Sequence, residues 1–262
     1  MMRVAAIGDN CIDVYPRLGK QYPTGNAVDF AVNIRKLGFP TALVSVTGND
    51  ANGQWMLDTL KAEEIDISHV RVGNGATAVT YMDMDGKDRV HGDYVEGVLA
   101  DLVFTPEEVE FAARHDLVHT AFWGKAENNL MELKAHGALL SFDYATKKDD
   151  PLVSRTLPHV DYAFFSLKQA EAEAFLQDAW KQGPKVVVGT FGVEGSAAYD
   201  GERFYHFGIF PARVENTVGA GDAYIAGFMA AILRGQSLDE ALRSGARVAA
   251  EVVEVFEPWV TN

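Results

Sequence analysis

Cysteine is almost absent from this chain: Cys11 is the single one among 262 residues. One cysteine excludes an internal disulfide framework and suits a reducing compartment, so we expect a cytoplasmic protein. Long hydrophobic runs are also missing, which disfavours a membrane span. The first residues, 1–9, combine a short apolar run with one basic residue, and they predict a buried strand instead of a signal peptide.

Positive charge is scarce as well, because 23 Lys and Arg stand against 37 Asp and Glu, for a net charge of −14. This balance excludes the basic surface that nucleic acids or anionic membranes require. The chain is 48% hydrophobic, an ordinary globular composition, and it is long enough to bury a sizeable core. The acid excess fits an enzyme whose substrate carries a positive group, although a solubilising acidic surface is the simpler explanation.

Short apolar runs alternate with amphipathic stretches along most of the chain. Strands are predicted at 4–7, 42–46, 117–119, 138–142, 162–165 and 186–188. Helices are predicted at 27–37, 55–60, 105–108, 129–135 and 169–182, and after the capping box at 237–240. This alternation predicts an α/β fold, with a mostly parallel sheet covered by helices on both faces.

One region breaks the alternation. Residues 77–84 alternate between apolar and polar, Asp85-Gly86 supplies a turn signal, and 87–94 alternate again. Together with the extended segment 12–18 they predict a small antiparallel sheet that covers the carboxyl ends of the parallel strands as a lid. No linker divides the chain, so we expect a single domain over 1–262, with lid strands at about 12–18 and 76–95.

The most informative motif is the Gly-rich stretch 216–222, which opens directly into an apolar helix. Backbone N–H groups at a helix N-terminus bind anions, and glycines let a phosphate approach the backbone closely. Asp222 then stands where a base could take a proton from a hydroxyl that attacks this phosphate. The motif predicts phosphoryl transfer to an alcohol; the alternative is a simple turn with Asp222 as a helix cap.

Other nucleotide-binding motifs do not fit. The chain has no Gly-x-x-x-x-Gly-Lys-Ser/Thr sequence, which excludes a P-loop of that type. Residues 73–78 match Gly-x-Gly-x-x-Ala, but an alternating strand follows them instead of a helix, so they do not predict a dinucleotide site.

Residues 216–229 resemble, position by position, the C-terminal signature of the ribokinase-like sugar kinases, also called the phosphofructokinase-B family. The resemblance implies a three-layer α/β/α sandwich with a small β lid, and an ATP-dependent kinase that uses Mg²⁺. It makes Asp222 the base, and it assigns the transferring phosphoryl group to the backbone amides of Gly219, Ala220 and Gly221.

The N-terminal signature of this family is present with two departures. Gly25 and Asn26 match it, whereas Thr24 replaces a glycine and Asp29 stands where asparagine is usual. The side chain of Asn26 can both donate to and accept from sugar hydroxyls, and a carboxylate can accept two hydroxyl protons. The resemblance assigns the sugar to Asp9, Asp13, Gly25, Asn26 and Tyr94.

The last third of the chain carries the features assigned to the nucleotide. Residues 190–196 resemble the Thr-x-Gly-x-x-Gly loop of the family, although alone they read equally as a hairpin turn. The resemblance assigns ATP to Lys168, Thr190, Gly192, Gly195 and Ala246. Glu171 matches the glutamate of the Asn-x-x-Glu motif, which helps to organise Mg²⁺, but a lysine stands at the asparagine position. Asn216 stands where many members have aspartate, which disfavours a monovalent cation there.

Segments outside these signatures resemble the members that phosphorylate fructosamines, namely 7–16, 66–70, 92–98 and 116–119. The resemblance implies transfer to the 6-hydroxyl of fructoselysine, an Amadori sugar–amine adduct. Asp93 or Glu96 then faces its lysine portion, unless both are solvated lid acids. Other fructosamines or ketoses remain as alternative substrates, and a non-catalytic sugar sensor is a remote one. The family also implies a homodimer formed through the lid.

Overall fold

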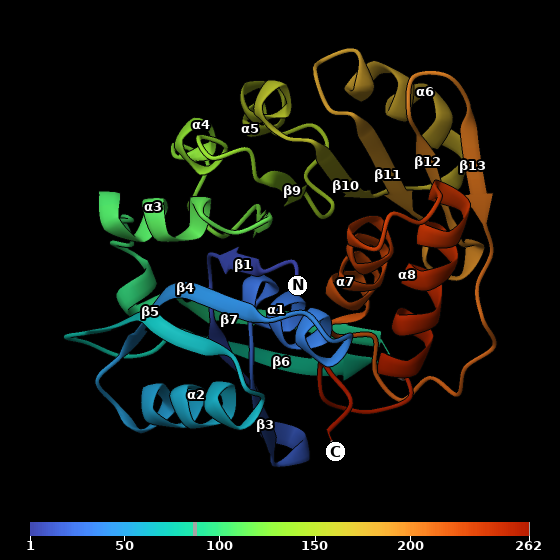
Figure 1. Ribbon diagram of the computed structural model, residues 1–262. Coiled ribbons are helices and arrows are strands. Elements are labelled where there is room, and N and C mark those ends of the chain that lie inside the picture. Colours follow the sequence, from blue (N-terminus) through green and yellow to red (C-terminus); the bar gives the residue numbers. More distant parts are fainter. Residues whose placement is uncertain (86–87, 262) are drawn as a thin grey trace.

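A nine-stranded sheet forms the centre of the molecule in this computed structural model, which describes residues 1–85 and 88–261 (Figure 1). Its order is β13-β12-β11-β10-β9-β8-β1-β4-β5. In chain order the strands are β1 (Val4–Ile7), β4 (Thr41–Gly48), β5 (Asp66–Gly73), β8 (Leu117–Ala121), β9 (Leu139–Asp143), β10 (Tyr162–Ser166), β11 (Val186–Thr190), β12 (Ser196–Tyr199) and β13 (Phe204–Phe207). All neighbours from β11 to β5 pair in parallel, and only the pairs made by β12 are antiparallel.

Helices cover both faces of this sheet, which confirms the predicted three layers (Figure 1). They are α1 (Asn26–Lys36), α2 (Ala51–Ala62), α3 (Pro106–Ala113), α4 (Leu130–Leu133), α5 (Pro151–Thr156), α6 (Gln169–Trp180), α7 (Ala220–Leu233) and α8 (Leu238–Val252). Successive side chains of a strand point to opposite faces. Accordingly, Val4 and Ala6 join the core under α1, α7 and α8, whereas Ala5 and Ile7 join the core under α3 to α6.

The strand order reverses between β1 and β8. From β1 the chain builds outward through β4 and β5, and it then returns to β8 and builds in the other direction. In open α/β sheets ligands bind at such a switch point, beyond the carboxyl ends of the strands. The two backbones meet closely there, because a Cβ built on Gly8 would lie 3.0 Å from the Cα of Gly124.

A second sheet of four strands has the order β3-β2-β6-β7. Its strands are β2 (Cys11–Tyr15), β3 (Lys20–Thr24), β6 (Val79–Asp85) and β7 (Asp88–Val95). The prediction of a wholly antiparallel lid is wrong: β2 and β6 pair in parallel, because a crossover through α1, β4, α2 and β5 separates them. The predicted turn at Asp85-Gly86 lies partly outside the described residues.

The predicted lid strand over 12–18 is also corrected. Residues Pro16–Leu18 form a 3₁₀ turn, because Pro16 fixes its φ and lacks an N–H, and Gly19 follows with φ of +59°. The chain then turns back as β3, which the sequence did not predict, since Pro23 interrupts it. The strand β5 was missed as well, because its exposed polar residues hide the alternation.

Each remaining predicted strand and helix is present, with ends that differ by a few residues. The helix predicted at 105–108 extends to Ala113, and its Thr105 cap and Glu108 form the expected capping box. The helix predicted at 129–135 is shorter and ends at Leu133. None of the helices in the part of the chain described here is long and apolar enough to cross a membrane.

Candidate active site

The Gly-rich turn leads into the first turn of α7, as the sequence predicts. Gly219 is the N-cap with φ of +68°, and a Cβ there would lie 2.6 Å from the carbonyl oxygen of Pro258. Any other side chain would therefore strain this turn. A Cβ on Gly221 would meet nothing within 4 Å, so space is open beside the first amides of α7. N–H groups at a helix N-terminus, together with the helix dipole, favour an anion, so the anion site at this turn stays a prediction.

Asp222, the third residue of α7, is almost fully buried beside this turn. The Nδ2 of Asn26 donates a hydrogen bond to its Oδ1 at 3.0 Å. Burial, followed by the charge of Asp143, raises the pKa of Asp222 well above its usual value, while the bond from Asn26 and the charge of Arg89 oppose this shift. The result is a carboxyl group of high proton affinity beside an anion site, as a general base requires.

The N-terminus of α1 is held by Asp9 from the loop after β1. Its Oδ2 accepts a hydrogen bond from the backbone N–H of Asn26 at 3.0 Å, and burial raises its pKa. Asp9 caps the helix from outside because the N-cap residue is Gly25, which has no side chain. A Cβ on Gly25 would lie only 2.7 Å from the Cα of Asn10. The contact of Asp9 with substrate stays a prediction beside this structural role.

The lid brings further charged groups toward the first turns of α1 and α7. Asp13 on β2 is buried, and burial raises its pKa to about 6, against a hydrogen bond from Thr80 and the charge of Arg89. Arg89, on β7, donates from Nη1 to the carbonyl oxygen of Thr217 at 3.4 Å, in the turn before α7. Burial also raises the pKa of the Tyr94 hydroxyl, and Asp9 contributes to this shift. Arg89 therefore reaches the turn before Asp222 from the lid, while Asp13 lies near Arg89 and Tyr94 lies near Asp9.

Asp143 is a member of this group that the sequence analysis missed. It is the last residue of β9, and its Oδ1 accepts the N–H of Ala145 at 2.8 Å. Burial raises its pKa to about 6, and the charge of Asp9 adds to the shift. The predicted strand at 138–142 stopped one residue short of it. An acidic residue at the carboxyl end of a buried parallel strand is the signal that could have revealed it.

The residues predicted to bind ATP lie in a more open part of the molecule. Lys168 is exposed at the N-cap of α6, and Glu171 in the first turn is bound by Lys148, with Nζ and Oε2 2.6 Å apart. Thr190 is the last residue of β11. Gly192 and Gly195 lie at the two ends of the turn that leads to β12, with φ of +59° and +94°.

A hollow of about 230 Å³ opens beside these residues, lined in part by Gln169, Phe191 and Phe207. Ala246 lies buried on α8, whose neighbour Gly245 packs against α7: a Cβ on Gly245 would lie 2.8 Å from the carbonyl oxygen of Tyr224. The predicted ATP residues thus come from both layers of helices, because Lys168 lies at the start of α6 on one face of the sheet and Ala246 lies on α8 on the other.

The carboxyl groups present fit Mg²⁺. No three ligating side chains converge on one point among residues 1–85 and 88–261. Mg²⁺ usually keeps several waters and binds through one or two carboxylates together with phosphate oxygens. Asp143 supplies a buried carboxyl group whose charge acts on Asp222, and Glu171 supplies one in the first turn of α6.

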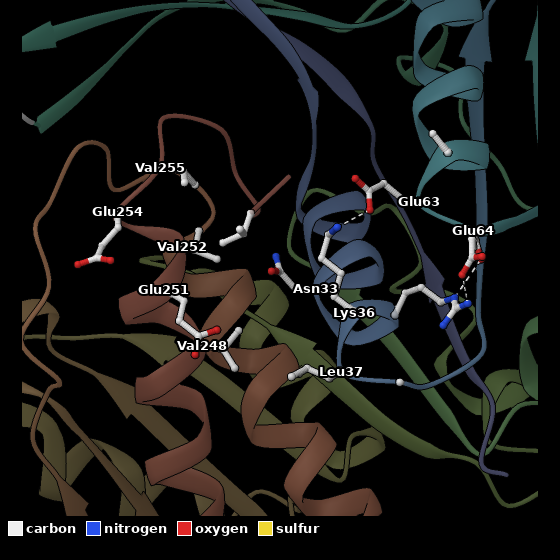
Figure 2. A pocket seen from close by; sticks show the side chains of 14 residues that line it. Asn33, Lys36, Leu37, Glu63, Glu64, Val248, Glu251, Val252, Glu254 and Val255 are labelled. Carbon is white, nitrogen blue, oxygen red and sulfur yellow. Dashed lines mark hydrogen bonds and ion pairs between the residues drawn. The ribbon is translucent and has the colours of Figure 1, made fainter. Parts of the chain in front are cut away.

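A cavity of about 950 Å³ opens elsewhere, between the C-terminal halves of α1, α2 and α8 (Figure 2). Apolar side chains such as Val248 and Val252 line it beside the ion pair between Lys36 and Glu63. None of the predicted site residues lines it. This cavity and the candidate active site are therefore separate features.

Comparison with known proteins agrees with this geometry. Residues 2–258 match the pfkB family of carbohydrate kinases. The chain is 38% identical to the fructoselysine 6-kinase of Shigella flexneri over 262 residues, which covers 99% of this chain and 100% of the relative. It is 34% identical to a fructosamine kinase of Bacillus subtilis (strain 168), over 97% of this chain and 92% of that protein.

Solved structures show the same fold. The ribokinase of Arabidopsis thaliana complexed with ribose and ATP superposes with a TM-score of 0.85 at 21% identity, covering 98% of this chain and 94% of that one. A structure from Escherichia coli in complex with ATP and Mg²⁺ gives a TM-score of 0.82 at 20% identity, over 98% and 94% of the two chains. At this level of identity the likeness establishes the fold alone.

Proposed function

Because the chain belongs to the pfkB family of carbohydrate kinases, we propose that it transfers the γ-phosphate of ATP to the 6-hydroxyl of fructoselysine. One observation supports the chemistry most directly: the buried carboxyl of Asp222 lies in the first turn of α7, where Asn26 holds it beside the N-terminus of the helix. The substrate rests on the fructosamine-phosphorylating relatives that match nearly the whole chain.

In the proposed mechanism, Asp222 accepts the proton of the 6-hydroxyl as its oxygen forms a bond to the γ-phosphorus. The bond from that phosphorus to the bridging oxygen of ADP breaks in the same step. The backbone N–H groups of Gly219, Ala220 and Gly221 stabilise the negative charge that develops on the phosphoryl oxygens. Mg²⁺, when bound near Asp143 and Glu171, neutralises phosphate charge.

The acceptor is held by groups around the base. Asp13, Gly25 and Asn26 orient the sugar so that one hydroxyl points along the line of transfer. Tyr94 and the rest of the lid exclude water, which would otherwise compete as the acceptor. Four buried carboxyl groups, those of Asp9, Asp13, Asp143 and Asp222, favour an acceptor with a positive charge, and a fructosamine carries one at its amine.

An acceptor panel tests this proposal. ADP release is measured with fructoselysine, another fructosamine, fructose and ribose, and NMR locates the phosphate on each product. We expect the highest kcat/KM with fructoselysine and a phosphate on carbon 6. A higher value with fructose or ribose would favour the alternative of a plain ketose or pentose kinase. Tight sugar binding without ADP release would favour the sensor.

The lysine portion of the substrate is the next point of the proposal. Asp93 and Glu96 are both exposed on or beside β7, and Glu96 pairs with Lys125 at 3.3 Å. This pair means that Glu96 already has a cationic partner, which a substrate ammonium could replace. We expect Glu96→Gln to raise the KM for fructoselysine and leave that for fructose unchanged. Asp93→Asn is the matched comparison, and unchanged KM values in both variants would contradict the idea.

We also propose that activity does not depend on a monovalent cation. Asn216 donates from Nδ2 to the carbonyl oxygen of Phe256 at 2.9 Å and accepts from the N–H of Val218 at 3.1 Å. Both ends of its neutral amide are thus hydrogen-bonded within the protein, at a position where an aspartate would supply a negative charge. Equal kcat in K⁺ and in a large organic cation is the expected result, and strong K⁺ activation would contradict it.

A second copy of the chain is the partner we propose for the lid. Tyr81, Val90 and Val95 leave 44–49% of their surface exposed on the lid strands. Light scattering should give the mass of two chains, and Val90→Lys should lower it to one. Val103→Lys, at a more exposed valine outside the lid, is the control. A single-chain mass for the unaltered protein would contradict the proposal.

A further inference from the structure

An exposed tryptophan lies in the loop between β8 and α4, at the carboxyl end of the central sheet. Trp123 leaves 43% of its surface exposed, and its ring meets that of Phe122 edge-on, with the ring centroids 5.4 Å apart. Both residues follow Ala121, the last residue of β8, so they lie on the side of the switch point where ligands bind. The mechanism proposed above uses neither ring.

The loop that carries this tryptophan is fixed at both ends. The backbone N–H of Phe122 donates to the carbonyl oxygen of Asp143 at 2.8 Å. At the other end, the Nζ of Lys125 donates to the carbonyl oxygen of Leu99 at 2.6 Å. A side chain held on a fixed loop loses little freedom when a ligand binds, so the exposed ring of Trp123 is suited to recognition.

This loop borders the buried carboxyl groups of the acceptor half. The side chain of Asp143, whose backbone holds one end of the loop, is one of the acids whose charge acts on Asp222. The middle of the loop packs against the residue before Asp9, because a Cβ built on Gly8 would lie 3.0 Å from the Cα of Gly124. The two rings therefore lie at the edge of the proposed sugar site.

A cation from the loop after β9 lies near both rings. The Nζ of Lys147 is 5.8 Å from the ring centroid of Phe122 and 5.9 Å from that of Trp123. Lys147 is exposed, and in the described part of the chain no acidic side chain pairs with it, whereas the neighbouring Lys148 binds Glu171 at 2.6 Å. The ammonium group of Lys147 is therefore available to a carboxylate of a ligand.

Aromatic faces beside one ammonium group favour a ligand with an apolar chain that ends in a carboxylate. Aromatic rings cover an alkyl chain and exclude water from it, and a lysine binds a carboxylate as a point charge. The lysine portion of fructoselysine has this composition, since its alkyl chain ends in an ammonium and a carboxylate. Glu96, proposed above for the ammonium, pairs with Lys125 of the same loop.

We propose that Phe122, Trp123 and Lys147 form the subsite for the amino-acid portion of the acceptor, with its alkyl chain against Trp123 and its carboxylate on Lys147. The inference rests on the proposed function. The subsite contacts a part of the substrate that does not react, so it raises affinity without taking part in proton transfer. Its variants should therefore change KM for fructoselysine more than kcat.

Calorimetric titration without ATP tests the subsite with fructoselysine, with the Amadori adduct of fructose and pentylamine, and with fructose. The pentylamine adduct keeps the alkyl chain but lacks the terminal ammonium and carboxylate. We expect Lys147→Met to weaken the binding of fructoselysine about fivefold and to leave the other two affinities unchanged. Trp123→Ala should weaken both adducts about tenfold and leave fructose unchanged.

Matched variants exclude a general effect on the fold. Lys181→Met removes an exposed lysine that pairs with Asp178, and Met131→Ala removes an apolar side chain on α4 that is 70% exposed. Both should keep all the measured affinities. Lys147→Arg and Trp123→Phe retain the charge and an aromatic ring, so they should restore most of the affinity for fructoselysine.

The outcomes separate this inference from the proposed function. If the unaltered enzyme binds fructose as tightly as fructoselysine, the proposed substrate is wrong and the subsite falls with it. If fructoselysine is preferred but Lys147→Met and Trp123→Ala keep that preference, only the subsite is overturned. A higher KM for ATP in Lys147→Met, with unchanged affinity for fructoselysine, would place this ammonium group on the nucleotide and also overturn the inference.

Discussion

The acceptor half and the nucleotide half of the candidate site are built differently. Around the base, Asp9, Asp13, Asp29, Asp143 and Asp222 each expose 8% or less of their surface, and hydrogen bonds hold Asp9, Asp29 and Asp222 in place. On the nucleotide side, Lys168 is exposed and Glu171 keeps 42% of its side-chain surface in contact with solvent.

The two halves are therefore expected to contribute differently to the reaction. Buried, fixed groups need no reorganisation during the reaction, so the acceptor half sets the chemistry. Exposed side chains interact weakly across water, so the nucleotide half contributes mainly to binding. Variants in the acceptor half should therefore have larger effects on activity than variants in the nucleotide half.

The largest effect is expected for Asp222→Asn. The amide keeps the shape of the side chain but cannot accept the hydroxyl proton, so kcat should fall about 10²–10⁴-fold. Steady-state kinetics with the sugar that is phosphorylated best measures this. The thermal midpoint serves as the control for folding. A kcat close to that of the unaltered enzyme would remove Asp222 as the base.

A smaller but clear effect is expected for Gly219→Ala. The left-handed φ of +68° and the carbonyl of Pro258 leave no room for a Cβ, so the turn should lose about 1–3 kcal/mol of stability. Gly221→Ala is the matched control for unfolding, because open space surrounds that position. Equal losses of unfolding free energy in denaturant would show that the anion turn is not held as described.

Arg89→Gln should change the pH dependence more than the substrate affinity. The charge of Arg89 lowers the pKa of Asp222, so its removal raises that pKa, and the acid limb of kcat should move up by about one pH unit. Arg17→Gln is the control, because Arg17 lies on the lid but pairs with Asp83 at the surface. An acid limb that stays in place would mean that the lid does not tune the base.

The smallest effect is expected on the nucleotide side, for Lys168→Ala. An exposed contact to a phosphate contributes up to about 1 kcal/mol, so the KM for ATP should rise no more than about fivefold, with kcat changed less. Lys181→Ala, just beyond the other end of α6, should leave both constants unchanged. A drop in kcat as large as that of Asp222→Asn would break the proposed division between the halves.

Structural features that depend on residues close together in the sequence were predicted well. The period of the apolar residues revealed most strands and helices, and the Gly-rich turn before α7 stood out because its glycines and Asp222 are adjacent in the chain. Asp143 was missed because the predicted strand stopped one residue before it, and its place in the site depends on Asp9 and Asp222, which lie far away in the sequence. In the lid, β3 and the parallel pairing of β2 with β6 were missed, because they depend on which distant strands lie side by side.

Residues close together in the chain were enough to predict the α/β alternation and the Gly-rich turn at 216–222 with its carboxylate, because each depends on a few neighbouring positions. The packing of distant segments was needed to show that Thr24 binds Asp29, that Asp9 caps α1 and that Asp222 is buried together with four other carboxyl groups. Burial and charge proximity depend on which distant segments pack together, and they set the proton affinities on which the proposed chemistry depends.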